Sequence, residues 1–236
     1  MDIYPNINGR INDWDIIVIG HLRVNTYFGE SYDNPPRGYP STCTSVMIRG
    51  IDGSGEPYVL IVDPTTRLTA EDYDFDVNRR TGLRLGDVTH CFFTHHHADH
   101  YEALDYFPFA QYFAPPDVAR LISGQIAESL RNKGKGAVSD DCGVPEIIGV
   151  TGEFLPGVCS VPLPGHTAEL CGVAFSHNDR KIIVAGDSVM TKYHFAAGTT
   201  DFQKEPALVR AAAQSIQNMK ESYDIVVPGH DNMILI

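Results

Sequence analysis

Side chains that commonly bind metal ions are concentrated in one short segment near the middle of the chain. The segment reads His95-His96-His97-Ala98-Asp99-His100 and directly follows the apolar run 88–93. Imidazole nitrogen and carboxylate oxygen are ligands for zinc, and also for iron or manganese. On a turn that leaves a strand, His95 and His97 can point the same way while Asp99 and His100 face a second ion. We therefore predict two metal ions here rather than one.

A solvated histidine-rich turn or an affinity tag would also place several histidines together. A tag lies at a terminus, whereas this segment is central and follows a run that is typical of a strand. A string of this composition arises by chance in roughly one chain in a thousand of this size. The metal interpretation is therefore favoured over both alternatives.

Three later turns carry further ligand-type residues next to a glycine. They are 164–167 with His166, 186–188 with Asp187, and 228–231 with His230, and each follows an apolar run. Glycine lets the backbone approach a site closely. One Gly-His turn is usually a surface feature, but the shared placement of three such turns after strands strengthens the prediction that they complete the metal site.

The elements that must position these residues alternate between strand-like and helix-like patterns. Apolar, β-rich runs predict strands at 15–20, 44–49, 58–62, 88–93, 111–114, 158–161, 172–175, 181–185 and 224–227. Helical spacing of apolar residues predicts helices at 115–130 and 205–221, and a weaker helix after Thr69. Segment 29–42, rich in Gly, Pro and Tyr, predicts a long loop, and 133–139 a second flexible stretch. Strands joined to helices in this way predict a layered α/β or α+β fold.

Composition limits the partners of the protein. The net charge of −12 disfavours binding to nucleic acid or to anionic membranes, and favours neutral or cationic small molecules as substrates. No apolar stretch has the roughly 18 residues of a membrane span. The five cysteines are scattered without a C-x-x-C pair, and the N-terminus shows no secretory signal. We expect a cytoplasmic protein, and the sequence is compatible with a homo-oligomer.

Taken in order, these motifs resemble the series that defines the metallo-β-lactamase superfamily. The matching segments are 94–100 (THHHADH), 165–167 (GHT), 186–187 (GD) and 228–230 (PGH), and 60–65 (LIVDPT) resembles the earlier strand-plus-Asp motif. The resemblance spans roughly residues 15–236. It implies one domain over 1–236 and a four-layer αββα sandwich, with two mixed β-sheets inside and helices outside.

The resemblance also implies a role for each matching residue. One metal ion would be bound by His95, His97 and His166. The second would be bound by Asp99, His100 and His230. Asp187 would bridge the two ions, and Asp63 would contact a ligand histidine from behind. Two divalent ions are implied, with zinc preferred and iron or manganese as alternatives.

Substrate contacts are less specific in the sequence. The quorum-signal lactonases of the superfamily carry a Tyr shortly after the bridging Asp, whereas Met190 lies three residues after Asp187 here. Tyr193 and His194 follow slightly later, and Tyr32 and Tyr39 lie in the 29–42 loop; we predict these four as substrate contacts. Residues 168–171 (AELC) stand where many members carry Pro-Gly and a small residue. Glu169 could therefore face the pocket entrance, but the favoured interpretation is a solvated turn residue.

The predicted activity is hydrolysis of an ester, lactone, thioester, amide or phosphoester by a hydroxide that bridges the two ions. Asp99 and Asp187 would be the catalytic carboxylates, with Asp99 also transferring a proton. The chain leaves no room for a C-terminal glutathione-thioester domain or for the inserted domain of the RNA-processing branch. An iron-dependent redox or oxygen-using enzyme is an alternative, although the flavodiiron group usually has Glu at position 97. A non-catalytic binding protein is a further alternative, which the full set of candidate ligands disfavours.

Overall fold

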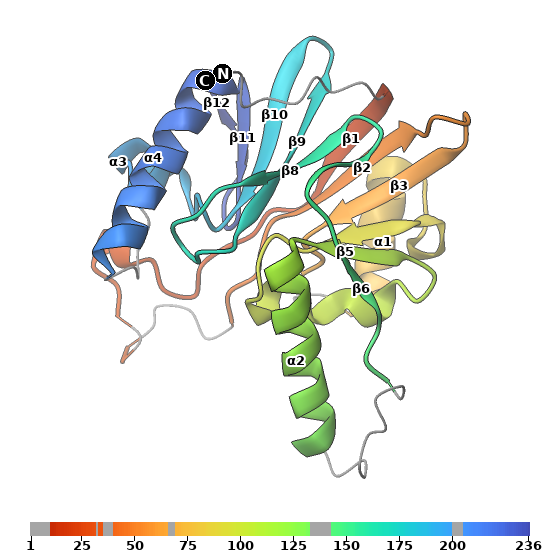
Figure 1. Ribbon diagram of the computed structural model, residues 1–236, viewed down its shortest axis with the longest axis horizontal. Helices are drawn as coiled ribbons and strands as arrows, with labels where there is room; N and C mark the ends of the chain where they lie inside the picture. The colour runs from red at the N-terminus through yellow and green to blue at the C-terminus, as the bar shows by residue number, and fades with distance from the viewer. Residues whose placement is uncertain (1–9, 32, 35–39, 66–68, 133–142, 200–204) are drawn as a thin grey trace.

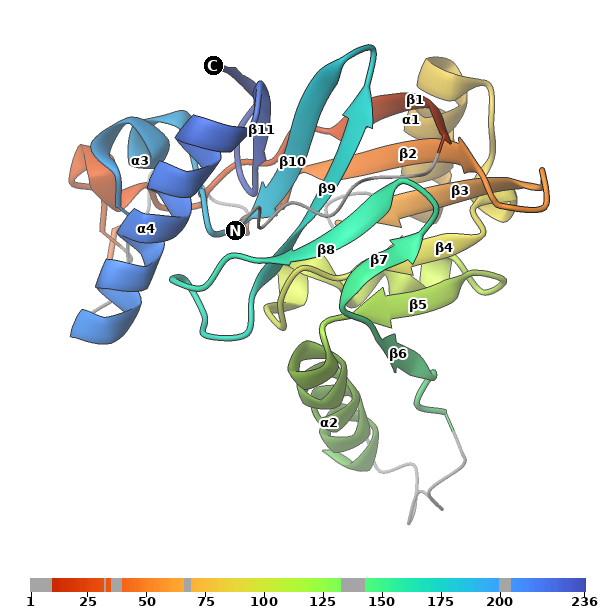
Figure 2. The ribbon, with the colours of Figure 1, turned by 45° about the horizontal axis from the view of Figure 1, so that its top comes forward.

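Two six-stranded β-sheets lie face to face at the centre of the computed structural model, which describes residues 10–31, 33–34, 40–65, 69–132, 143–199 and 205–236 (Figures 1 and 2). The first sheet has the order β1-β2-β3-β4-β5-β6, formed by Arg10–Val18, Ser45–Ile51, Pro57–Val62, His90–Phe92, Gln111–Ala114 and Ile147–Gly149. The second has the order β12-β11-β10-β9-β8-β7, and its strands from β7 to β12 are Gly152–Leu155, Val158–Pro162, Cys171–His177, Arg180–Gly186, Ile225–Pro228 and Ile234–Leu235.

Both sheets mix parallel and antiparallel pairs. In the first sheet β1, β2 and β3 are antiparallel neighbours, whereas β3, β4, β5 and β6 run parallel. In the second sheet only the β10–β11 pair is parallel. The predicted pair of mixed sheets is therefore confirmed.

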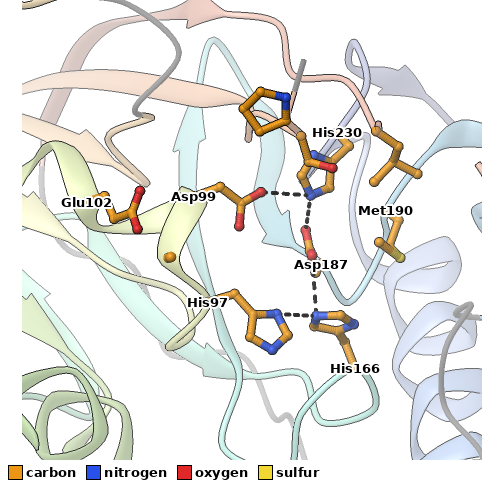
Figure 3. A pocket seen from close by; sticks show the side chains of 11 residues that line it. His97, Asp99, Glu102, His166, Asp187, Met190 and His230 are labelled. Carbon is orange, nitrogen blue, oxygen red and sulfur yellow. Dashed lines mark hydrogen bonds and ion pairs between the residues drawn. The ribbon is translucent and has the colours of Figure 1, made fainter. Parts of the chain in front are cut away.

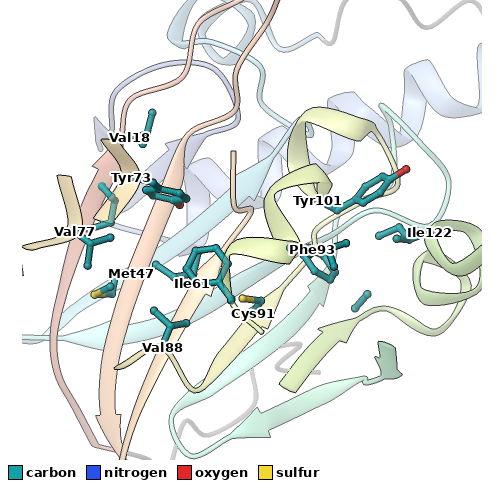
Figure 4. Packing of buried hydrophobic residues seen from close by; sticks show 14 of the residues in the cluster. Val18, Met47, Ile61, Tyr73, Val77, Val88, Cys91, Phe93, Tyr101 and Ile122 are labelled. Atoms are coloured by element: carbon teal, nitrogen blue, oxygen red, sulfur yellow. The ribbon is translucent and has the colours of Figure 1, made fainter. Parts of the chain in front are cut away.

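Continuous apolar runs, rather than alternating ones, follow from the burial of both faces of the sheets. In β3, Leu60 and Val62 pack between the two sheets, and Ile61 points to the opposite face. The cluster between the sheets joins Val46, Ile48 and Phe92 of the first sheet to Val173, Phe175, Ile182 and Val184 of the second. Figure 4 shows the other face of the first sheet, where Met47, Ile61 and Cys91 pack with Tyr73 and Val77.

Helices cover the two outer faces and complete four layers. The first sheet is covered by α1 (Ala70–Thr81) and α2 (Pro116–Asn132), and α3 (Lys192–Ala197) and α4 (Pro206–Ser222) cover the second. Short 3₁₀ helices occupy Thr26–Phe28, Leu85–Asp87, Ala98–His100 and Glu102–Tyr106. The αββα arrangement that the resemblance implied is thus present.

The weakly predicted helix after Thr69 is confirmed as α1, because both of its ends are capped. The Thr69 side chain accepts a hydrogen bond from the backbone N–H of Asp72, and Gly82 ends the helix in the left-handed conformation with φ 76°. These local signals compensate for a helix whose average composition is polar.

The predicted strands and helices are all present, β5 with the predicted bounds and the others with shifted ends, and the strands and α-helix that were not predicted are short. They are β6, β7, β12 and α3, which span two to six residues each and offer too little sequence for a periodic pattern. Within 29–42 the described residues form only turns and isolated bridges. Residues 32, 35–39 and the predicted flexible stretch 133–139 lie outside the described part of the chain.

Candidate metal centre

The histidine segment leaves the first sheet at the end of β4, between its parallel neighbours β3 and β5. Phe93 still donates its N–H to the carbonyl of Phe113 at 2.9 Å, and the chain then turns into the 3₁₀ helix Ala98–His100. Within this turn the N–H of His100 donates to the carbonyl of His97 at 3.0 Å. The turn reverses the chain so sharply that His95 and His100 are both fully buried.

Asp63, directly after β3, fixes the histidine segment from behind. Its carboxylate accepts hydrogen bonds from the backbone N–H of Thr94 at 2.8 Å, from the Thr94 hydroxyl at 2.7 Å, and from Nδ1 of His100 at 2.9 Å. Asp63 is buried and has a φ of 51°, which is uncommon outside glycine. Because Nδ1 of His100 donates to Asp63, Nε2 is the ring atom that faces the cluster.

The second sheet supplies three further side chains from turns at the ends of its strands. His166 follows β8, Asp187 follows β10 and His230 follows β11. Nδ1 of His230 donates to the carbonyl of Thr42 at 2.8 Å, which orients its Nε2. Gly229 is required because a Cβ atom there would lie 2.1 Å from Oδ1 of Asp187. The glycine beside the histidine therefore admits the carboxylate of a neighbouring strand.

The seven predicted ligands come together as two groups of donor atoms. The first group contains His95, His97, His166 and Asp187, and the second contains Asp99, His100 and His230. Within each group the potential ligand atoms all lie within 4.8 Å of one another. This division places Asp187 with His95, His97 and His166 in the first group. Figure 3 shows the side chains that face the pocket.

Asp187 lies between the two groups. Its Oδ2 is 3.4 Å from Nε2 of His166 and 3.8 Å from Nε2 of His95. Its Oδ1 is 3.3 Å from Nε2 of His100 and 3.2 Å from Nε2 of His230. One carboxylate oxygen thus faces each group, the geometry that a bridging ligand needs.

The spacing of these atoms fits a transition-metal cation. Ligand atoms about 2 Å from a tetrahedral zinc ion lie roughly 3.3 Å from one another. The contacts of Asp187 described above, at 3.2 to 3.8 Å, and the 2.9 Å between Nδ1 of His97 and Nε2 of His166 lie near this value. In addition, Nε2 of His95, Nε2 of His100 and Oδ1 of Asp187 are buried and make no directed hydrogen bond. Buried polar atoms are rarely left unsatisfied, so the donor set fits a cation.

Electrostatics at the centre also favour cation binding. Burial lowers the pKa of His166 to about 4, and burial together with neighbouring His100 lowers the pKa of His95 well below its usual range. These imidazoles are therefore neutral and offer lone pairs. Burial also acts to lower the pKa of His230, but the carboxylate of Asp187 outweighs it and raises that pKa. Without a cation, negative charge at the centre is thus balanced by protons on histidine.

The centre opens into a cavity of about 520 Å³ with one apolar and one acidic side. Leu22, Pro40 and Met190 form the apolar wall, whereas Asp99 and Glu102 supply carboxylates. No lysine or arginine is among the residues that line this cavity in the described part of the chain. The described lining of this cavity therefore carries carboxylates and no cationic lysine or arginine side chain.

The predicted substrate contacts are only partly near this cavity. Tyr193 lines an adjoining cavity of about 240 Å³ together with Phe28 and His230. His194 lines neither cavity; it is buried, and its Nδ1 is 2.7 Å from the hydroxyl of Thr191. Tyr32 and Tyr39 lie outside the described residues.

Some functional positions were missed or misinterpreted in the sequence. Leu22 and Glu102 line the main cavity, yet only Glu102 had a signal, because it follows Asp99 by three residues. The interpretation of Glu169 as a solvated turn residue was wrong: its side chain is only 17% exposed, and Oε1 lies 2.6 Å from Nδ1 of His96. No pattern in the sequence indicates that these two residues meet.

Comparison with solved structures shows the same fold in proteins of low sequence identity. A metallo-β-lactamase candidate from Thermotoga maritima matches with a TM-score of 0.65 and 19% identity, over 96% of this chain and 100% of the other. An N-acyl homoserine lactone hydrolase, solved with its product N-hexanoyl-L-homoserine at the catalytic metal centre, matches with a TM-score of 0.61 and 14% identity, over 96% and 94% of the two chains. AiiA from B. thuringiensis matches with the same scores and coverage.

A comparison with curated proteins gave no match. No helix in the described part of the chain is both long and apolar enough to cross a membrane. The model of the metallo-beta-lactamase superfamily matches residues 38–230, which include Asp63 and every residue of the two donor groups. With the motif order, the αββα layers and the two donor groups in agreement, the chain belongs to the metallo-β-lactamase superfamily.

Proposed function

We propose that this protein is a dinuclear metal-dependent hydrolase of small carbonyl substrates, with esters and lactones preferred over thioesters, amides and phosphoesters. The observation that carries the proposal is the position of Asp187, whose two carboxylate oxygens each face one group of histidines. Zinc is the preferred metal because imidazole and carboxylate at this spacing suit it. Iron or manganese would be bound by the same residues.

His95, His97 and His166 would hold one ion, Asp99, His100 and His230 the other, and Asp187 both. When bound, two divalent ions would lower the pKa of a bound water to about 7 and would neutralise the negative charge that develops on the carbonyl oxygen. Asp63 keeps the Nε2 lone pair of His100 directed at the centre through its 2.9 Å contact with Nδ1.

Asp99 is the proposed proton carrier. Its side chain is 24% exposed and lines the cavity, and only Oδ2 is directed at His230, at 3.7 Å. The second carboxylate oxygen can therefore accept a proton from the attacking water and return it to the leaving oxygen. Leu22 and Met190 exclude water from one side of the reacting bond. Because Asp187 is buried, it is less suited than Asp99 to proton transfer.

The preference for carbonyl substrates rests on the charge of the cavity. A phosphomonoester or phosphodiester carries a negative charge that lysine or arginine usually neutralises, and the described residues that line the cavity include neither. An ester or lactone is neutral and requires no such partner. The structural resemblance to proteins named as acyl homoserine lactone hydrolases supports a lactone as one substrate of choice.

Metal analysis combined with a substrate panel tests the proposal. Protein purified without added metal should contain about two zinc ions per chain. It should hydrolyse neutral esters or lactones, lose this activity to a chelator, and regain it with zinc. Stoichiometric iron with a visible absorption band and no hydrolysis would instead identify a redox enzyme. Tight metal binding without turnover of any ester, lactone, thioester, amide or phosphodiester would indicate a binding protein.

A further inference from the structure

An ion pair between His96 and Glu169 lies beside the metal centre without belonging to either donor group. Nδ1 of His96 is 2.6 Å from Oε1 of Glu169, and the side chains are 23% and 17% exposed. Both atoms are buried, and neither makes a directed hydrogen bond to another described residue. Buried polar atoms are costly to leave without a partner, so this 2.6 Å contact favours keeping the two side chains together.

The pair joins the two chain segments that carry the histidines of the first donor group. His96 stands between His95 and His97, and Glu169 follows His166 in the turn between β8 and β9. The backbone closes this turn, since the N–H of Leu163 donates to the carbonyl of Leu170 at 2.9 Å. Because one segment comes from each sheet, the relative position of their imidazoles depends on contacts between segments.

The second donor group has different outer contacts. Asp63 accepts from Nδ1 of His100, and the carbonyl of Thr42 accepts from Nδ1 of His230. Neither contact involves His96 or Glu169. A change at the ion pair should therefore reach the first group and spare the second.

We propose that His96 and Glu169 are a positioning pair that sets the distance between the His95/His97 segment and His166, and so determines the metal affinity of the first donor group. This inference rests on the proposed metal-binding role of that group. Contacts of this outer kind change metal affinity by about 10- to 100-fold when removed. The pair bears on a metal ion through the geometry of its ligands, not by coordinating it.

Equilibrium zinc affinity, measured by competition with a chromophoric chelator, tests the pair. Wild-type protein should bind two ions, and Glu169→Ala should weaken one of them by about 10- to 100-fold. The affected group is identified in two backgrounds. In the His230→Ala background the second group is impaired, so the tightly bound ion is held by the first group, and Glu169→Ala should lower the affinity for that ion. In the His166→Ala background the tightly bound ion is held by the second group, and Glu169→Ala should change the affinity for that ion little.

Three variants separate positioning from other effects. Glu169→Gln keeps a polar side chain of the same size beside Nδ1 of His96, so it should retain most of the wild-type affinity. His96→Ala combined with Glu169→Ala should be no weaker than either single variant, because both break the same contact. Glu71→Ala removes an exposed carboxylate at the start of α1, away from the pair and the cavity, and should leave the affinity of the first group nearly unchanged.

The results distinguish failure of the inference from failure of the proposed function. If wild-type protein binds no divalent ion tightly, both are overturned. If it binds two ions and Glu169→Ala binds them equally well, only the positioning role is overturned. Equal weakening of both ions, with a parallel fall in the unfolding temperature of the metal-free variant, would also overturn it in favour of a general structural role.

Discussion

At the scale of single residues, the centre depends on a few carboxylates surrounded by histidines. Asp187 is buried between four imidazoles, and burial alone would raise its pKa, yet His230, His100 and His166 hold that pKa well below the usual range. Asp63 has a different role, because its carboxylate oxygens accept hydrogen bonds from Thr94 and His100. The two carboxylates are therefore not interchangeable in their effects.

Replacing Asp187 with Asn should remove the charge that the two donor groups share. We expect loss of at least one of the two ions and a fall in kcat/KM larger than the roughly 10- to 100-fold typical of outer contacts. Metal content by elemental analysis and steady-state kinetics check this. Asp179→Asn, in the exposed turn between β9 and β10, is the matched control. Full activity and unchanged metal content in Asp187→Asn would contradict the bridging role.

The depressed pKa of His166 predicts how the metal-free protein responds to acid. Between the folded value of about 4 and the unfolded value of about 6.5, the unfolded chain binds a proton that the folded chain does not. The free energy of unfolding should therefore fall as the pH is lowered through this window, by up to about 1.4 kcal/mol per pH unit from this imidazole. Above about pH 7 this contribution is fully restored.

Urea unfolding of the metal-free protein at several pH values between 4 and 7 measures this slope. His166→Gln should give a shallower dependence than wild type. Other groups with shifted pKa values contribute to the remaining slope, among them His95 and His97, whose pKa values burial also lowers. His177→Gln, at the other end of β9 from the centre, serves as the control. An unchanged slope in His166→Gln would show that this ring is not buried in its neutral form.

At the scale of elements, the centre is built from strand ends and not from strands. Asp63, the histidine segment, Asp187 and His230 all follow the last residue of a strand, and four different strands contribute them. Tight turns after β10 and β11 bring Gly186 and Gly229 together, and the N–H of Gly229 donates to the carbonyl of Gly186 at 3.0 Å. The parallel pairing of β10 with β11 puts these two ends at the same edge.

Gly229→Ala should disturb this junction, because the added methyl group would lie 2.1 Å from Oδ1 of Asp187. We expect a loss of about 1–3 kcal/mol in the free energy of unfolding, together with weaker metal binding. Gly53→Ala, in a turn where an added Cβ meets nothing within 4 Å, should change neither quantity appreciably. Denaturant titrations and metal content of both variants decide the matter. Equal stability of the two variants would show that the junction can move to admit the methyl group.

At the scale of the whole molecule, charge and cavity lining act in the same direction. The net charge of −12 repels polyanions, and the cavity next to the centre adds Glu102 to the acidic side. The exposed aromatic side chains of Tyr27, Phe28 and Tyr193 pack against one another near the adjoining cavity, with Phe28 and Tyr193 4.7 Å apart between ring centroids. Under the proposed function, this surface would contact the apolar part of a substrate remote from the ester or lactone group.

A matched pair of esters tests the charge preference: one with a quaternary ammonium group on the alcohol and one with an uncharged carbon isostere. Glu102→Gln should reduce kcat/KM for the cationic ester about two- to five-fold, the effect of one exposed charge, and leave the neutral ester nearly unchanged. The difference should shrink at high salt because the charge is exposed to solvent. Glu71→Gln, on the exposed start of α1, should affect neither ester. A similar loss on both esters would mean that Glu102 acts on geometry.

The sequence by itself determined the donor residues and the layered fold. Residues 94–100 are contiguous, and His166, Asp187 and His230 each stand beside a glycine after an apolar run, so local spacing was sufficient to find them. The runs that form β2, β3, β9 and β10 are apolar at consecutive positions because both faces of each sheet are covered, and this too is a local signal.

Only the tertiary structure decided which side chains meet across the two sheets. Three features depend on how distant turns pack. Glu169 contacts His96, Leu22 and Met190 line the same cavity, and His194 is buried away from it. Short elements such as β6 and α3 were missed for a related reason, since they form by pairing or packing with neighbours and not from their own periodicity. Which residues can bind a metal follows from side-chain types and their local spacing in the sequence. How those residues are positioned follows from contacts between segments that are distant in the sequence.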